Sequence, residues 1–279
     1  MHALEPIETV DLLPALHVEL LALLRTLSPA DWRKPTIAEP WTVPDMAAHL
    51  LDTDIRRLSF QRDGLAPLPP PQPISSYQDL VAFLNQLNGE WVAAARRISP
   101  QLLIGFLELI GPEVHALFKS LDPNAPASIS VAWAGEDVSL NWFDIAREYT
   151  EKWHHQQHIR EAVGAPLLTG KRWLAPVLDT FLRGLPHTYR DVVAPDGVQL
   201  TIVIDGEAGG VWTLRRQEQA WRLYAGANAT ASAQIALDQD IAWRLFTKGI
   251  SSDAARSHAR ISGDESLAAH LLQLLAIMA

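Results

Sequence analysis

The segment from Glu148 to Arg160 constrains this chain more than any other. It lies between Asn141 and Val163, in a run without Gly or Pro and with apolar residues at helical spacing, which predicts one long helix over 141–163. Residues three and four apart share a helix face. The predicted helix therefore carries one polar stripe, formed by Asp144, Glu148, Glu151, His155 and His158.

This stripe has two readings. Carboxylates and imidazoles together suit a divalent metal ion, because ionised carboxylate and neutral histidine are ligands that zinc and its neighbours prefer. Glu151 and His155, four residues apart, can chelate one ion from a single helix. Taken alone, the stripe fits a solvated helix face better, because short motifs often match by chance. A metal site needs a third ligand from another segment. His154 points away from the stripe, and we expect it at the surface.

Composition excludes several classes of function. The 279 residues are 48% hydrophobic, which is enough for one large or two ordinary domains. The formal net charge is -9 and there is no basic run, which argues against nucleic acid as a partner. There is no cysteine, so thiol chemistry would need a thiol from a bound cofactor.

Targeting signals are missing from the sequence. No apolar run approaches the roughly 18 residues of a membrane span. The start, Met-His-Ala-Leu-Glu-Pro, lacks the basic and apolar regions of a signal peptide. We therefore expect a soluble cytoplasmic protein with no membrane partner.

The first half of the chain has the periodicity of helices. We expect helices over 7–27, with Pro14 in the first turn or a later start, over 45–62, and over 77–97. Thr42 or Val43 would cap the second and Ser75 or Ser76 the third. Pro100 and Pro112 should break the next stretch into shorter pieces ending near Leu121, and 128–140 has the alternation of a short hairpin. Four main helices with long crossovers predict an up-down bundle, whose interior commonly holds metal sites.

The second half has a different pattern. One interrupted helical region over 171–189 precedes strands at 198–205, 211–216, 221–225 and 231–237, and helices at 240–246 and 265–278 close the chain. Strands followed by helices indicate a separate small domain. The fold class expected is mainly α: a four-helix bundle over 1–166, followed by an α+β domain with an antiparallel sheet over 167–279.

A second motif surrounds His49, in Pro40-Trp41-Thr42-Val43-Pro44-Asp45 followed by Met-Ala-Ala-His-Leu. A lone His on an apolar helix is usually a satisfied core residue. With the later Glu-x-x-x-His, however, the motif resembles the DinB-like four-helix metal-binding family, and most closely its mycothiol-dependent maleylpyruvate isomerase type. The resemblance implies one divalent ion, zinc or alternatively nickel, held by His49, Glu151 and His155.

The resemblance extends over the whole chain. The segment 196–246 and the ending 261–268 look like the sterol-carrier-protein-like domain that follows the bundle in that branch. One position departs from the family pattern, which often has Asp three residues after the last ligand, where this chain has His158. His158 is therefore a candidate substitute for a carboxylate partner or an additional ligand.

The resemblance also implies chemistry. Two imidazoles and one carboxylate leave zinc an open position, in which a mycothiol-like low-molecular-weight thiol binds as thiolate and adds to a small electrophile, as in an isomerase or S-transferase. Glu148 and His158 are candidates for ligand support or proton transfer, with exposed ion pairing as the simpler alternative. Arg215, Arg216 and Arg222 could meet an anionic substrate, although solvent-facing strand positions explain them as well.

Two other functions fit the sequence. A non-enzymatic protein could carry a small molecule or lipid in the C-terminal domain, and a hydrolase of the same fold could use metal-bound water. Trp41, Trp142 and Trp153 are expected in the core or in a pocket wall. A homodimer is compatible with the sequence, which does not determine the oligomeric state.

Overall fold

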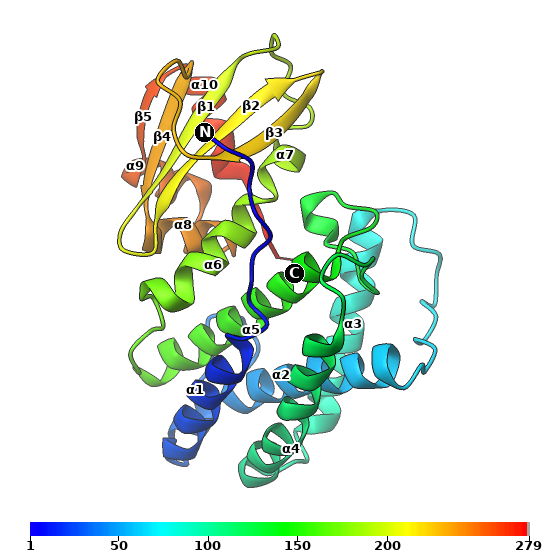
Figure 1. The fold of residues 1–279 in the computed structure, drawn as a ribbon. Coiled ribbons are helices and arrows are strands. Elements are labelled where there is room, and N and C mark those ends of the chain that lie inside the picture. The colour runs from blue at the N-terminus through cyan, green and yellow to red at the C-terminus, as the bar shows by residue number, and fades with distance from the viewer. Residues whose placement is uncertain (278–279) are drawn as a thin grey trace. The chain divides into compact units, whose positions relative to one another are not determined.

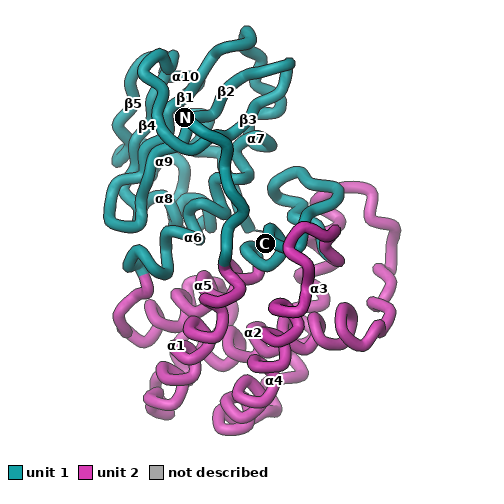
Figure 2. The backbone as a smooth tube through the Cα atoms, in the orientation of Figure 1, with its two compact units in different colours: residues 1–8, 129–147, 169–278 teal, residues 9–128, 148–168, 279 magenta. Residues whose placement is uncertain are grey.

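The computed structural model describes residues 1–277 and divides into two compact units (Figure 2). The helical unit comprises residues 9–128 and 148–168. Among the described residues, the sheet unit comprises residues 1–8, 129–147 and 169–277. The helix that carries Glu148 therefore contributes to both units. A domain boundary at 166/167 stays a prediction.

Five long helices form the first part of the chain (Figure 1). They are α1 (Leu13–Thr26), α2 (Val43–Arg57), α3 (Tyr77–Ala95), α4 (Pro100–Ser120) and α5 (Asn141–Val163). The first of them starts later than the apolar pattern, with Pro14 in its first turn, where the missing N–H costs no hydrogen bond.

Polar caps fix the starts of three of these helices. At α2, the Thr42 backbone N–H donates to Asp45 Oδ2 at 3.0 Å in a capping box. At α3 and α4, the side chains of Ser76 and Ser99 accept from the backbone N–H groups of Asp79 and Leu102. Each cap satisfies donors that the first helical turn leaves unpaired.

The helical unit has a continuous apolar core. Its centre is the inner face of α2, where Met46, Ala47 and Leu50 are at most 2% exposed. Residues of α1, α4 and α5 complete the core, including Leu24, Leu107 and Ile159, while α3 packs against α2. This core holds α2 and the second half of α5 in one unit, and these are the two elements that carry the candidate ligands.

Two local expectations were wrong. Pro112 does not break α4, because it lies on the exposed side of the helix, while Val114 and Phe118 beyond it are buried and anchor the last turns. The expected hairpin at 128–140 is instead an irregular segment with a short 3-10 helix, Ala132–Ala134. Ser139 Oγ accepts from the Val131 backbone N–H at 2.8 Å, a local bond that takes the place of a strand ladder.

The sheet unit contains a five-stranded sheet in the order β3-β2-β1-β4-β5. The strands are β1 (Gln199–Asp205), β2 (Gly210–Gln217), β3 (Ala220–Ala225), β4 (Ala233–Asp238) and β5 (Arg260–Gly263). Three neighbouring pairs are antiparallel, and β1 pairs with β4 in parallel, with Ile202 opposite Ile235. The sheet is thus antiparallel for the most part, and the sequence missed β5.

Helices cover one face of this sheet (Figure 1). The helices that pack directly on the strands are α7 (Leu185–Thr188), α8 (Gln239–Phe246) and α10 (Glu265–Ala269). Two more, α6 (Lys171–Leu182) and α9 (Ser252–His258), pack against α8. The closing helix expected over 265–278 is shorter, and a 3-10 turn, His270–Gln273, follows it. Its expected last residue, Met278, lies outside the described residues. The mainly α fold with a following α+β part is confirmed.

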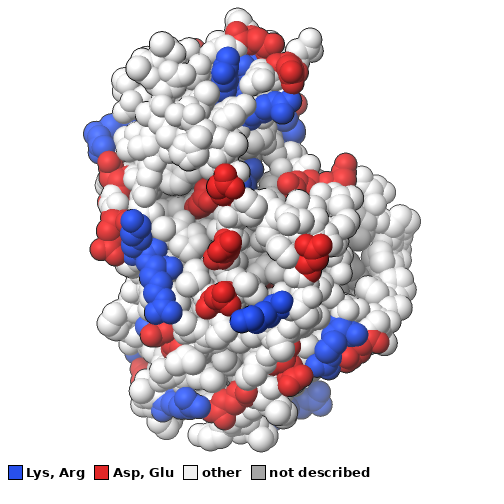
Figure 3. Space-filling model, viewed as in Figure 1, with Lys and Arg blue, Asp and Glu red and all other residues white. Residues whose placement is uncertain are grey.

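On the face shown in Figure 3, basic and acidic side chains are interspersed, without a basic surface that extends across it. Among the described residues, α4 is long and apolar enough to cross a membrane, by length and composition alone. In this structure α4 packs against α1 and α2.

Candidate metal centre

The first candidate ligand, His49, is positioned by the capped start of α2. Thr42 and Asp45 fix the first turn, and His49 follows one turn later. The indole of Trp41 lies beside the His49 ring, with 5.0 Å between ring centroids. His49 is 6% exposed, so both its ring and its backbone are held in the core of the helical unit.

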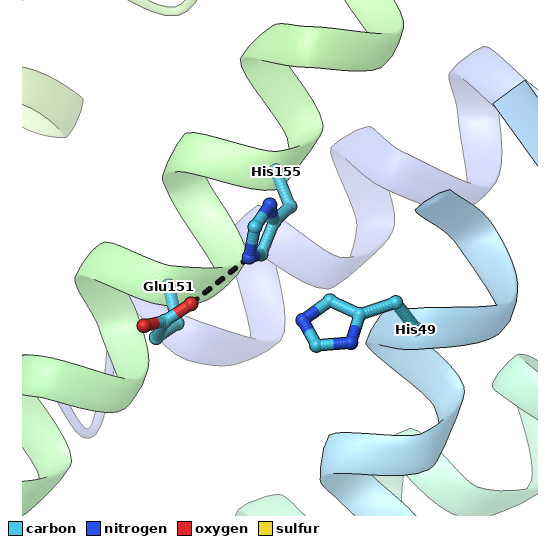
Figure 4. A group of neighbouring side chains, drawn as sticks. All are labelled: His49, Glu151 and His155. Atoms are coloured by element: carbon cyan, nitrogen blue, oxygen red, sulfur yellow. Dashed lines mark ion pairs between the residues drawn. The ribbon is translucent and has the colours of Figure 1, made fainter. Parts of the chain in front are cut away.

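Two residues of α5 meet His49. The ligand atoms of His49, Glu151 and His155 all lie within 4.8 Å of one another (Figure 4). His155 Nε2 is 3.0 Å from Glu151 Oε2, and the His155 and His49 rings are nearly perpendicular, with 4.7 Å between centroids. Helical spacing on α5 and the α2–α5 packing therefore bring together three groups that are far apart in the sequence.

The electrostatic environment keeps His49 neutral. Burial lowers its pKa well below the usual value, and the neighbouring His155, Arg56 and Lys152 lower it further. A neutral imidazole has the lone pair that a metal ion requires. Nδ1 of His49 and Nδ1 of His155 are both buried without a hydrogen-bond partner among the described residues.

Two buried ion pairs lie next to this cluster and join the same two helices. Arg57 of α2 donates from Nη2 to Glu148 Oε1 at 2.9 Å, and Lys152 of α5 pairs with Asp54 of α2. The four side chains are between 3% and 11% exposed. Burial raises the pKa of Asp54, and the Lys152 ammonium acts against that rise. The pairs fix which residues of α5 face His49.

Glu148 and His158 differ from the exposed ion-pair partners that were the simpler expectation. Glu148 does form an ion pair, but it is 4% exposed. His158 is 7% exposed and its ring lies 5.4 Å from that of His155, centroid to centroid. Burial and His155 lower the pKa of His158 to about 3, against the influence of Glu151. His158 is therefore a neutral neighbour of the cluster.

His154 was wrongly expected at the surface. It is 5% exposed, and its ring lies 4.2 Å from that of His158. The reason is that α5 is buried around most of its circumference: Trp153 and Gln157, which share a neighbouring face, are both 0% exposed. The Gln157 side chain accepts from the backbone N–H of Leu168, and the Trp153 indole N–H donates to the carbonyl of Leu168. The polar residues of α5 thus belong to a buried helix and not to a solvent-exposed one.

The three residues of the cluster fit a divalent cation. Two imidazoles and one carboxylate are a common donor set for zinc and for other first-row ions. The unpartnered ring nitrogens show that the protein does not use up the hydrogen-bonding capacity of these histidines. Neutral imidazoles next to one carboxylate would give a site with a formal charge of about +1 once a divalent ion is bound.

Sequence reasoning did not find all the polar groups around this cluster. Asp54, Arg57 and Lys152 were missed, because their partners are distant in the sequence. The signal available was the charge at the end of α2, which carries Asp52, Asp54, Arg56 and Arg57 within six residues. Arg215 and Arg222 lie opposite each other on β2 and β3, in the sheet unit.

Comparisons with known proteins agree with this architecture. Two crystal structures, of the mycothiol-dependent maleylpyruvate isomerase and of a histidine-to-alanine mutant of it, match with a TM-score of 0.54. The identities are 13% and 12%, and in both cases the match covers 88% of this chain and 91% of the other. At this identity the likeness shows the fold. No curated protein matches the sequence.

A family model identifies the chain more directly. The model of the mycothiol maleylpyruvate isomerase N-terminal domain matches residues 13–160, which is more than half of the chain and includes His49, Glu151 and His155. The sterol-carrier-protein-like assignment of residues 167–279 stays a prediction. This chain belongs to the mycothiol maleylpyruvate isomerase N-terminal domain family.

Proposed function

We propose that the protein is a divalent-metal-dependent enzyme that uses a low-molecular-weight thiol to isomerise a small, electron-poor alkene. The observation that carries the proposal is the convergence of His49, Glu151 and His155 within 4.8 Å, in a chain whose family is named for a mycothiol-dependent isomerase. Maleylpyruvate, or a similar cis-unsaturated acid, is the proposed substrate.

The metal would make the thiol more acidic. A zinc or nickel ion held there would lower the pKa of a thiol, whose free value is about 8.5, and would favour the thiolate at neutral pH. The chain has no cysteine, so the thiol must be exogenous. In the family's named reaction that thiol is mycothiol.

The protein's own residues hold this arrangement. His49, Glu151 and His155 would hold the ion. With one carboxylate among these residues, the site would carry a charge that a single thiolate balances, which would favour the thiolate in a buried setting. Arg57 and Lys152 are already paired with Glu148 and Asp54, so they add no net charge to the site. The Trp41 indole shields one side of His49.

Isomerisation then needs no net consumption of thiol. The thiolate adds to one alkene carbon, a C–S bond forms, and the electron pair of the double bond moves onto the conjugated carbonyl. Rotation about the resulting single bond and elimination of the thiolate restore the double bond with trans geometry. The thiol is regenerated, so a catalytic amount is enough.

The test is a thiol-dependent rate. Metal-loaded protein with maleylpyruvate should turn over only when mycothiol or another low-molecular-weight thiol is present, and His155→Ala should lower kcat/KM by about a hundredfold or more. His258→Ala, an exposed histidine of the sheet unit, is the control and should be fully active. Turnover without any thiol, or full activity of His155→Ala, would reject the proposal.

A further inference from the structure

A groove lies at one end of the helical unit, where α1 and α3 end and α2 and α4 begin. Its volume is about 560 Å³, within the range of small-molecule sites. All its lining residues belong to the segment 27–101, and none of His49, Glu151 and His155 lines it. The groove is therefore separate from the candidate metal centre.

The floor of the groove is apolar. Trp32, Ala48 and Ala95 are 7%, 2% and 4% exposed, and Leu27 and Ile98 are half-buried beside them. Small residues at 48 and 95 leave room over the floor, and an apolar molecule placed there removes both its own surface and that of the floor from water.

The rim of the groove carries an excess of positive charge. Arg96 binds Asp45 through two bonds, Nε to Oδ1 at 3.0 Å and Nη2 to Oδ2 at 3.1 Å, while Asp45 also caps α2 through Thr42. The Asp45 carboxylate is thus fully engaged, and the Arg96 side chain is still 57% exposed. Arg33 makes no ion pair within residues 1–277.

Helix dipoles do not alter this balance. Two helices begin and two end around the groove, so their partial charges of opposite sign offset one another. Side chains therefore set the local charge: Arg33 and Arg96 oppose the single carboxylate of Asp45. One negative charge on a ligand would balance the site.

We propose that this groove binds a small monocarboxylate with a flat apolar body. The body lies on Trp32 and Ala48, and the carboxylate accepts hydrogen bonds from the guanidinium groups of Arg33 and Arg96. Arginine suits this role because its planar fork matches the geometry of a carboxylate. The proposal does not depend on the function proposed for the metal centre.

Calorimetric titration of 2-naphthoate into the full-length protein tests the site. We expect saturable binding of one molecule, about fivefold weaker in Arg33→Gln, since an exposed charge contact contributes up to about 1 kcal/mol. Gln101→Trp places a large ring at the rim and should block binding. Arg97→Gln removes an exposed arginine that does not line the groove and should bind as the unaltered protein does.

Two further titrations locate the probe. 2-Naphthylmethanol has the same rings without the charge. It should bind more weakly than 2-naphthoate by at least the factor expected for Arg33→Gln, because it loses its contacts to both Arg33 and Arg96. His155→Ala should bind 2-naphthoate unchanged; loss of binding there would place the carboxylate at the metal centre and overturn the proposal. No saturable binding, or binding insensitive to both Arg33→Gln and Gln101→Trp, would also overturn it.

Discussion

Replacing Lys152 by Met should destabilise the helical unit strongly. Lys152 and Asp54 are 11% and 3% exposed, so the substitution leaves a buried carboxylate without its cation. Removing one partner of a buried ion pair typically costs about 3–5 kcal/mol. The protein can escape part of this cost by protonating Asp54, which at pH 7 costs about 1.4 kcal/mol for each unit by which the pH exceeds the pKa of that carboxyl.

Protonation of Asp54 limits the stability that Lys152→Met loses and makes that loss depend on pH. For a carboxyl with an ordinary pKa, protonation at pH 7 costs about 4 kcal/mol, and burial raises the pKa of Asp54, which reduces that cost. We therefore expect Lys152→Met to lose about 3 kcal/mol at pH 7. A raised folded-state pKa means that the variant loses stability as pH rises, so the deficit should be smaller at pH 5.

Urea denaturation with a chelator present, at pH 7 and pH 5, measures this loss without a contribution from bound metal. Asp54→Asn combined with Lys152→Met should be less destabilised than the sum of the single variants, by at least about 1.5 kcal/mol. Arg25→Met, in an exposed pair with Glu108, is the control and should cost at most about 1 kcal/mol. Additive single effects, or a Lys152→Met loss below 1 kcal/mol at pH 7, would refute the reasoning.

Three other predictions concern the packing of the helical unit. Gly111→Ala places a methyl group 2.5 Å from the His17 ring and should cost about 1–3 kcal/mol in urea denaturation, less when combined with His17→Ala. Burial lowers the pKa of His17 to about 4 and that of His115 to about 3. Below pH 6.5 the unfolded chain therefore binds more protons than the folded one, and the free energy of unfolding should fall steadily from pH 6.5 to 4. A free energy of unfolding that stays constant over this range would contradict the prediction. Trp153→Phe removes the bond to the Leu168 carbonyl and should cost about 1–3 kcal/mol, which a Tm shift would detect and an unchanged Tm would exclude.

Local patterns specified most of the elements. The helix expected over 141–163 has those bounds, and Thr42 caps α2, because caps and uninterrupted periodicity are encoded within a few residues. The continuation of α4 through Pro112 could not be predicted from the neighbouring residues. It depends on which side of α4 faces the solvent, and that is decided by packing against other helices.

The candidate site shows the same limit. The pairing of Glu151 with His155 follows from helical spacing, whereas the approach of His49 depends on how α2 packs against α5, and only the family resemblance indicated it. His154 was misplaced because a polar helix can be buried when its polar groups find partners on other segments. Arg57 is such a partner for Glu148, and a single sequence does not reveal this pairing.

The most direct test of the central claim is elemental analysis of protein purified without a chelating column, alongside Glu151→Ala and His155→Ala. The account predicts about one zinc or nickel ion per chain in the unaltered protein, and loss of that ion in both variants while both remain folded. Metal-reconstituted protein that retains no ion, or variants that retain a full equivalent, would contradict the assignment of His49, Glu151 and His155 as a metal centre.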